Sequence, residues 1–207
     1  TNPHNPTGQL WSKKSLEKIL PNYKLVICDE AFLSITPEGE KESLIPLVKS
    51  VDNLVVIRSL TKLFSIAGLR LGYIVGPSKL LKKFSKKRDP WPLNSFAIKA
   101  GITLLKDQKA YRAWTEKIHK WIKIERNWMF LEISNIKNLK VFSSSTNFFL
   151  IKSKYSLIPN INYLSRKKIL IRECSSFRSL NNKWARISLQ KHSQNKKIAK
   201  EIYNSFL

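Results

Sequence analysis

Short, uninterrupted apolar runs alternate with helical patterns in the first half of the chain. Residues 24–28 (KLVIC) and 54–59 (LVVIRS) are two such runs, and residues 73–76 form a shorter third one. A helical stretch near residues 44–48 lies between the first two runs. A strand buried on both faces reads as a continuous apolar run, and strand–helix–strand order with short links is typical of a parallel sheet. This half of the chain therefore predicts an α/β fold with a parallel-rich sheet.

Helical patterns and their end signals predict the elements around this sheet. Ser12 is a typical N-cap for a short helix that Pro21 and Asn22 end. A basic helix is expected over residues 78–87, and a second helix over residues 95–105.

The second half of the chain mixes strand and helix patterns. Apolar residues recur at helical spacing over residues 110–133, which predicts one long helix with a buried stripe. Two further helices are expected near residues 161–167 and 193–205. The expected strands cover residues 140–142, 147–151, 169–172 and 185–188. We therefore expect two domains, with a smaller α+β domain in the second half.

Composition narrows the class of protein. A chain of 207 residues with 43% hydrophobic content is large enough to fold around a packed core. The 38 Lys and Arg residues against 14 Asp and Glu give a net charge of +24, which would suit a nucleic acid partner. The excess of positive charge is greatest in the C-terminal third. It is spread through helices and turns, without a long basic tract or an RNA-recognition motif. We interpret most of it as a solvated basic surface, so nucleic acid is not the expected partner.

Cysteine usage and hydropathy argue against a disulfide-rich protein, a metal-binding protein and a membrane-spanning protein. Cys28 and Cys174 lie far apart and outside any ligand-spaced cluster, so neither a disulfide framework nor a metal site is expected. A reducing cytoplasm is the simplest location. No apolar run approaches the ~18 residues that a membrane span needs.

The string SLTKLFSIAGLRLGY, which begins at Ser59, is the strongest candidate for chemistry. Lys62 follows a predicted strand end, where an amine that is partly desolvated near cations becomes nucleophilic enough to form an imine. Ser59 and Arg70 flank it with a hydroxyl and a guanidinium, which together suit a phosphate dianion. Gly68 and Gly72 allow a tight backbone path that brings Arg70 back towards Lys62. The alternative is an ordinary turn with exposed basic residues.

Three motifs in this order resemble those of the type I fold of pyridoxal-phosphate enzymes, to which the class I and II aminotransferases belong. The string from Ser59 resembles the S-x-x-K-x-x-x-x-x-G-x-R-x-G cofactor motif. NPTG at residues 5–8 resembles the family's N-P-T-G turn, and DEA at residues 29–31 resembles its strand-end aspartate motif. The three together are far more specific than any one of them, and the resemblance extends over all 207 residues.

The resemblance implies a role for each matching residue. Lys62 would hold pyridoxal 5'-phosphate as a Schiff base and later move protons as a general acid and base. Asp29 would pair with the pyridine nitrogen and keep it protonated, so that the ring accepts electrons. Asn5 would hydrogen-bond the 3-oxygen of the ring, while Ser59 and Arg70 would hold the 5'-phosphate.

Two arginines near the C-terminus are candidates for substrate binding. ARIS at residues 185–188 resembles the strand whose arginine binds the substrate α-carboxylate, which implies that role for Arg186. Arg172, on the preceding predicted strand, offers a second guanidinium. Two arginines in one pocket suit a substrate with two anionic groups. The alternative is that Arg172 belongs only to the basic surface.

Within the family, the sequence is most similar to threonine-phosphate decarboxylases of cobalamin biosynthesis, and next to histidinol-phosphate aminotransferases. Phe32 stands where these aminotransferases usually have a tyrosine that bonds the cofactor, a bond that phenylalanine cannot make. DPWPLN at residues 89–94 also favours the decarboxylase. We expect a decarboxylase acting on a phosphorylated amino acid, with an aminotransferase of the histidinol-phosphate type as the alternative. An inactive fragment with a basic, nucleic-acid-binding surface is the distant alternative.

The resemblance also implies parts that this sequence does not contain. In the family, a glycine-containing loop around the phosphate and an aromatic ring stacked on the pyridine lie upstream of the position of Thr1. We therefore expect an N-terminal portion to be missing, and this chain alone to bind cofactor weakly. Residues 1–108 then correspond to the remainder of the large cofactor-binding domain, and residues 109–207 to the small C-terminal domain. A homodimer is the expected assembly.

Overall fold

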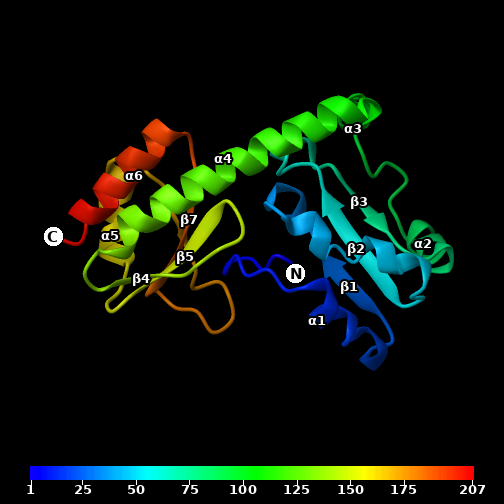
Figure 1. Ribbon diagram of the computed structural model, residues 1–207, viewed down its shortest axis with the longest axis horizontal. Coiled ribbons are helices and arrows are strands. Elements are labelled where there is room, and N and C mark those ends of the chain that lie inside the picture. The colour runs from blue at the N-terminus through cyan, green and yellow to red at the C-terminus, as the bar shows by residue number, and fades with distance from the viewer. The chain divides into compact units, whose positions relative to one another are not determined.

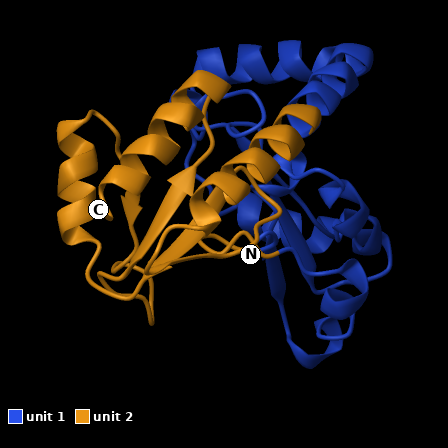
Figure 2. Ribbon diagram, turned by 60° about the vertical axis from the view of Figure 1, so that its left-hand side comes forward, with its two compact units in different colours: residues 1–3, 10–119 blue, residues 4–9, 120–207 orange.

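The computed structural model describes residues 1–207, and Figure 1 labels its α-helices and most of its strands. The chain divides into two compact units (Figure 2). Unit 1 comprises residues 1–3 and 10–119, and unit 2 comprises residues 4–9 and 120–207. The short segment 4–9 thus belongs to unit 2, although its neighbours in sequence belong to unit 1. The expected domain boundary between residues 108 and 109 stays a prediction.

Unit 1 is built on a three-stranded sheet with the strand order β1-β2-β3. β1 (Val26–Asp29) and β2 (Leu54–Ser59) are parallel, as the apolar runs predict. β3 (Gly72–Val75) pairs with β2 in the antiparallel direction, because the link of residues 60–71 forms a returning loop and not a crossover helix. The carboxyl ends of β1 and β2 therefore lie at one edge of the sheet.

Helices and 3₁₀ turns join these strands. Ser12 caps the first helix as predicted, because its hydroxyl accepts a hydrogen bond from the backbone N–H of Ser15 at 3.2 Å. Asn94 caps α3 in the same way, through the N–H of Ala97 at 2.9 Å. The helical elements of unit 1 are α1 (Lys13–Glu17), η1 (Leu20–Asn22), η2 (Leu33–Ile35), η3 (Gly39–Glu42), η4 (Ile45–Lys49), η5 (Ala67–Leu69), α2 (Ser78–Ser85), α3 (Ser95–Lys106) and α4 (Gln108–Ser134) up to residue 119.

One face of the unit 1 sheet is buried and the other is partly open. The buried face packs against the turns at residues 20 and 44; its buried side chains are Leu20, Cys28, Leu44, Leu54 and Val56. On β1, Cys28 is 7% exposed whereas Ile27 is 54% exposed. The expectation that this strand is buried on both faces is therefore wrong for this chain, since its outward apolar side chain has nothing packed over it.

Unit 2 is an antiparallel sheet with helices. The strand order is β4-β5-β7-β6, and the strands are β4 (Leu139–Val141), β5 (Phe148–Ser153), β6 (Arg172–Glu173) and β7 (Trp184–Ser188). The helices are α4 from residue 120, α5 (Ile158–Arg166) and α6 (His192–Asn204).

The helices of unit 2 contribute buried side chains and hold one another through polar contacts. Ile122, Met129 and Ile133 of α4 are buried, as the predicted apolar stripe requires. The hydroxyl of Tyr163 on α5 donates to Oε2 of Glu201 on α6 at 2.8 Å. None of the helices combines the length and the apolar character that a membrane span requires.

Candidate functional site

Asp29 and Ser59 end two neighbouring parallel strands. Asp29 lies opposite Ile57 in the ladder, so the last residues of β1 and β2 reach the same edge of the sheet. The N–H of Glu30 extends the pairing by donating to the carbonyl oxygen of Ile57 at 2.9 Å. Open α/β sheets bind ligands at this edge. The structure thus brings two predicted cofactor-binding residues to the expected place.

Lys62 and Arg70 lie on the loop that joins β2 to β3. Ser59 pairs with Gly72 at the base of this loop, so all three predicted residues belong to one closed segment. Arg70 has a left-handed backbone with φ of 52°, and its Nη1 donates to the carbonyl oxygen of Ala67 at 3.3 Å. The guanidinium is otherwise exposed to solvent.

The two glycines of the loop differ in what they contribute. A Cβ on Gly72 would lie 2.8 Å from the carbonyl oxygen of Arg58, so the close pairing of the two strands requires glycine there. A Cβ on Gly68 would meet no atom within 4 Å. Of these two glycines, only Gly72 is therefore required by sterics.

The amine of Lys62 lies beside the segment that follows β1. Its Nζ is 5.3 Å from the centroid of the Phe32 ring, which is within the range of a cation–π contact. Phe32 lies in the turn just after Asp29. The lysine of the β2–β3 loop therefore extends towards the end of β1, where the predicted aspartate is.

Ser59 has a partner that the sequence analysis did not identify. Its Oγ lies 2.7 Å from Oγ1 of Thr61 and accepts a hydrogen bond from the N–H of Thr61 at 3.3 Å. Two hydroxyl groups therefore sit together just before Lys62. The only signal in the sequence was the position of Thr61 inside the lysine motif.

An ion-pair cluster, formed by the buried Glu30 and Arg58 with the exposed Glu40, also went unidentified. Nε of Arg58 is 2.8 Å from Oε2 of Glu30, and its Nη1 and Nη2 donate to the two carboxylate oxygens of Glu40 at 2.7 and 2.9 Å. Arg58 is 5% exposed and Glu30 is fully buried. An arginine inside an otherwise apolar strand was the signal for this cluster, since such a charge needs buried partners.

In unit 2, the turn at residues 5–8 is held by the loop before β5. The carbonyl oxygen of Gly8 accepts a hydrogen bond from the N–H of Ser145 at 2.8 Å. Gly8 has φ of 72°, and a Cβ on it would collide with the hydroxyl of Ser144. The glycine is therefore required both by its backbone conformation and by this close approach.

This turn places Asn5 against Arg186 of β7. Oδ1 of Asn5 accepts a hydrogen bond from Nη1 of Arg186 at 2.5 Å. Arg186 lies directly opposite Arg172 in the β6–β7 ladder, and Nη2 of Arg172 donates to Oγ of Ser176 at 2.9 Å. Residues opposite each other on antiparallel strands point to the same face. The two predicted substrate-binding arginines are therefore neighbours on one face of the sheet.

Arg186 is half-buried and only partly hydrogen-bonded. Its Nε is buried without a hydrogen-bond partner, and the guanidinium carbon is 4.8 Å from the centroid of the Phe148 ring. Burial lowers the pKa of Arg186, and the positive charge of Arg172 also lowers it. An anionic ligand would satisfy the free donor and relieve the repulsion between the two guanidinium groups.

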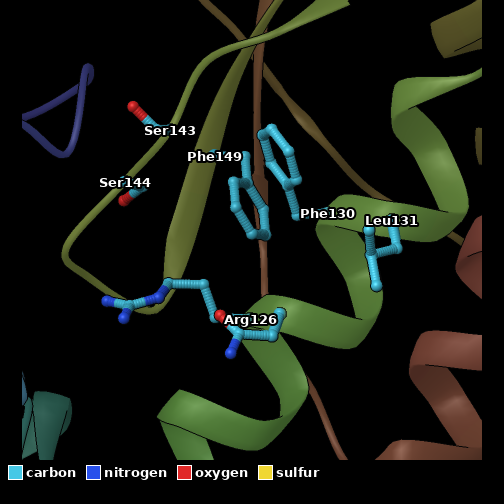
Figure 3. Close-up of a pocket in the computed structure, with 7 residues that line it drawn as sticks. Arg126, Phe130, Leu131, Ser143, Ser144 and Phe149 are labelled. Carbon is cyan, nitrogen blue, oxygen red and sulfur yellow. The ribbon is translucent and has the colours of Figure 1, made fainter.

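A hollow of about 400 Å³ lies between α4 and β5 in unit 2. It is lined by Arg126, Asn127, Phe130, Leu131, Ser143, Ser144 and Phe149 (Figure 3). Phe149 pairs with Ile187, whereas Arg186 pairs with Leu150. Because neighbouring strand residues point to opposite faces, the hollow is on the face opposite Arg186. It is therefore separate from the predicted substrate site.

Comparison with known proteins identifies relatives along the whole chain. The model of a family described as aminotransferase class I and II matches residues 1–202. Threonine-phosphate decarboxylase of Salmonella typhimurium is 29% identical over 98% of this chain, and histidinol-phosphate aminotransferase of Methanosarcina barkeri is 35% identical over 96% of it. The alignments cover 55% and 51% of these two proteins, so the chain spans about half the length of the curated relatives that it matches.

A solved structure gives the same result for the fold. The crystal structure of histidinol-phosphate aminotransferase from Clostridium acetobutylicum matches with a TM-score of 0.90 and 30% sequence identity. The match covers 99% of this chain and 62% of that chain.

Proposed function

The chain belongs to the aminotransferase class I and II family, and we propose that it provides the cofactor-holding lysine of an enzyme acting on a phosphorylated amino acid. Enzymes of this family depend on pyridoxal 5'-phosphate, and the relatives are named as decarboxylases and as aminotransferases. The structural match confirms the predicted fold class, a type I α/β fold, and covers 62% of the matched chain. The roles of individual residues and the choice of reaction are part of the proposal.

Three charged groups of unit 1 suit the cofactor. Asp29, Lys62 and Arg70 form no ion pair with any other residue of this chain. Oδ1 of Asp29 only accepts a hydrogen bond from the N–H of Ala31 at 2.9 Å, within its own turn. A carboxylate, an amine and a guanidinium without ion-pair partners are the groups that a pyridine nitrogen, an aldehyde and a phosphate require. This set of unpaired groups, with the amine directed towards the end of β1, is the observation that carries the proposal.

Each of these residues then has a defined task. When bound, the cofactor supplies a protonated ring that accepts electrons from the substrate. Asp29 would keep the ring nitrogen protonated, while Lys62 would hold the cofactor and move protons to and from the substrate carbon. Ser59 and Arg70 would bind the phosphate. Asn5 would donate to the 3-oxygen of the ring from its amide nitrogen, because its oxygen already accepts from Arg186.

The substrate class follows from the two arginines of unit 2. Like charges directly opposite each other destabilise an antiparallel pair. Arg172 and Arg186 nevertheless occupy such positions, and Arg186 keeps a free, buried Nε. A substrate with a carboxylate and a phosphate would neutralise both guanidinium groups. We therefore infer that Arg186 binds the α-carboxylate and Arg172 the phosphate of an amino acid phosphate.

Decarboxylation is the preferred reaction, and transamination of the histidinol-phosphate type is the alternative. The sequence feature that favours the decarboxylase is Phe32, which lies near the amine of Lys62 and has no hydroxyl with which to bond the cofactor. The outcome depends on which bond of the substrate carbon is held perpendicular to the cofactor ring. Both reactions would use the same residues in the same roles.

Cofactor uptake tests the proposed class of enzyme. The protein is incubated with excess pyridoxal 5'-phosphate, and the visible absorbance of the lysine-bound cofactor is recorded for the wild type and for Lys62→Ala. We expect a band in the wild type that is absent from the variant. A wild type that remains colourless and that is retained on DNA in a salt-dependent way would instead favour the basic, nucleic-acid-binding alternative.

The products separate the two enzymatic alternatives. The full-length protein, loaded with cofactor, is supplied with threonine phosphate in the absence of a keto-acid acceptor, and carbon dioxide is measured. Release of carbon dioxide is the expected result. Turnover that strictly requires an acceptor would identify the protein as an aminotransferase.

A further inference from the structure

The cluster of Glu30, Arg58 and Glu40 lies immediately behind the ends of β1 and β2. Glu30 follows Asp29 in sequence, and Arg58 precedes Ser59. Neighbouring residues of an extended strand point to opposite faces of the sheet. Glu30 and Arg58 therefore join the two strands on one face, while Asp29 and Ser59 belong to the other face, with Ser59 two residues beyond Ile57, the ladder partner of Asp29.

Every oxygen of the Glu30 carboxylate is occupied. Oε1 accepts a hydrogen bond from the N–H of Leu44 at 2.7 Å, and Oε2 accepts one from Oγ of Ser43 at 2.9 Å. Oε2 is also 2.8 Å from Nε of Arg58. Burial raises the pKa of Glu30, and the hydrogen bond from Leu44 and the charge of Arg58 oppose that rise.

Arg58 bridges Glu30 to a more exposed carboxylate. Nη1 and Nη2 of Arg58 donate to the two carboxylate oxygens of Glu40, whose side chain is 50% exposed. Nη2 also donates to Oγ of Ser43 at 2.8 Å. The guanidinium is therefore fixed in position and in orientation. Glu40 belongs to η3 and contacts Arg58 from outside both strands, while Glu30 and Ser43 also hold the guanidinium.

A buried ion pair is a poor source of stability, because the desolvation of two charges offsets most of their attraction. What such a pair provides is one fixed geometry. We propose that Glu30 and Arg58 are positioning residues, which set the spacing between Asp29 and Ser59. They thereby determine how well Asp29 binds the ring nitrogen and Ser59 binds the phosphate of the cofactor. This inference rests on the proposed cofactor function.

Cofactor binding by matched variants tests the inference. Glu30→Gln and Arg58→Met remove the connection between the strands, and the double variant Glu30→Gln/Arg58→Met removes it without leaving a buried charge unpaired. Glu40→Gln is the control, because it removes a partner of the same guanidinium outside the strands. Far-ultraviolet circular dichroism first establishes that each variant is folded. The dissociation constant of pyridoxal 5'-phosphate and the visible circular dichroism per bound cofactor are then measured.

We expect cofactor affinity to fall about tenfold in the two single variants and in the double variant, as is common for residues that support a ligand-holding group. The visible circular dichroism at saturation should fall as well, because a loosely held ring is less ordered. Glu40→Gln should stay within about twofold of the wild type. Unchanged affinity and dichroism in a folded double variant would overturn the inference and leave the proposed function intact. Failure of the wild type to take up cofactor on Lys62 would instead overturn the proposed function.

Discussion

The two units hold their charged site residues in different ways. In unit 1, Ser59, Lys62 and Arg70 share one loop, whose base is closed by strand pairing. In unit 2, Arg186 is held by Asn5, which lies 181 positions away in the sequence. The first arrangement is encoded by residues that are close in the sequence, whereas the second forms only when distant segments fold together.

The difference predicts different consequences of substitution. The unit 1 residues are proposed to bind the cofactor, so changes there should alter cofactor uptake. The arginines of unit 2 are proposed to bind the substrate, so changes there should mainly alter substrate binding and affect cofactor uptake only through Asn5, the partner of Arg186. Variants that mix these two effects would break the comparison.

Arg186→Lys has the largest expected effect on the unit 2 side. Lysine keeps the charge but loses the planar fork that binds a carboxylate through two parallel hydrogen bonds. A loss of about 100-fold in kcat/KM is expected, which corresponds to one charged hydrogen bond of the stronger kind. Steady-state kinetics with the amino acid phosphate measures it. Absorbance of bound cofactor is the control and should change much less than kcat/KM, because Arg186 is linked to the cofactor-binding residues only through Asn5; an equal loss of both would mean that Arg186 does not act mainly on the substrate.

Gly72→Ala tests the closed base of the unit 1 loop. The added methyl group would lie 2.8 Å from the carbonyl oxygen of Arg58, so the strands must separate. We expect a loss of about 2 kcal/mol in the free energy of unfolding, as is typical of overpacking. Gly68→Ala is the matched control, because its methyl group would meet no atom within 4 Å. Equal losses in the two variants, measured by urea denaturation, would contradict this account of the loop.

Asn5→Ala tests the long-range contact of unit 2. The substitution leaves a half-buried guanidinium with one hydrogen bond fewer. We expect a loss of about 1 kcal/mol in the free energy of unfolding. A double-mutant cycle with Arg186→Met isolates the contact, since the two effects should not add. Simple additivity would show that Asn5 and Arg186 do not interact in solution.

Cys28 gives an expected effect that depends on pH. Burial, followed by the charge of Glu30, raises the pKa of Cys28 from 9.0 to about 12. Above pH 9 the thiol of the unfolded chain ionises while that of the folded chain stays protonated. The folded state then holds more protons, so its stability falls as pH rises, by less than about 1.4 kcal/mol per pH unit. Between about pH 8 and about pH 10 the free energy of unfolding should fall more steeply in the wild type than in Cys28→Ala. Equal slopes would refute the raised pKa of Cys28.

The sequence predicted the elements that local patterns encode. The apolar runs gave β1 and β2, the cap at Ser12 gave α1, and helical periodicity gave α4. The loop from Ser59 to Gly72 could also be anticipated, because its residues are adjacent in the chain.

Contacts between distant residues could not be predicted in the same way. The register that places Arg172 opposite Arg186 depends on how β6 and β7 pair, and no local pattern specifies it. The partners of Arg58 lie in a strand end and in a 3₁₀ turn, so the sequence indicated only that a buried arginine would need them. The open face at Ile27 was missed because an apolar run does not show which of its faces will be covered.

Covalent trapping of the cofactor on Lys62 is the most direct test of the central claim. The protein is incubated with pyridoxal 5'-phosphate, reduced with borohydride and digested, and the modified lysine is identified by mass spectrometry. We predict that the peptide containing Lys62 is labelled at lower cofactor concentration than any other lysine peptide, and that Asp29→Ala weakens this preference. Labelling spread evenly over the exposed lysines, with no preference for Lys62, would contradict the account.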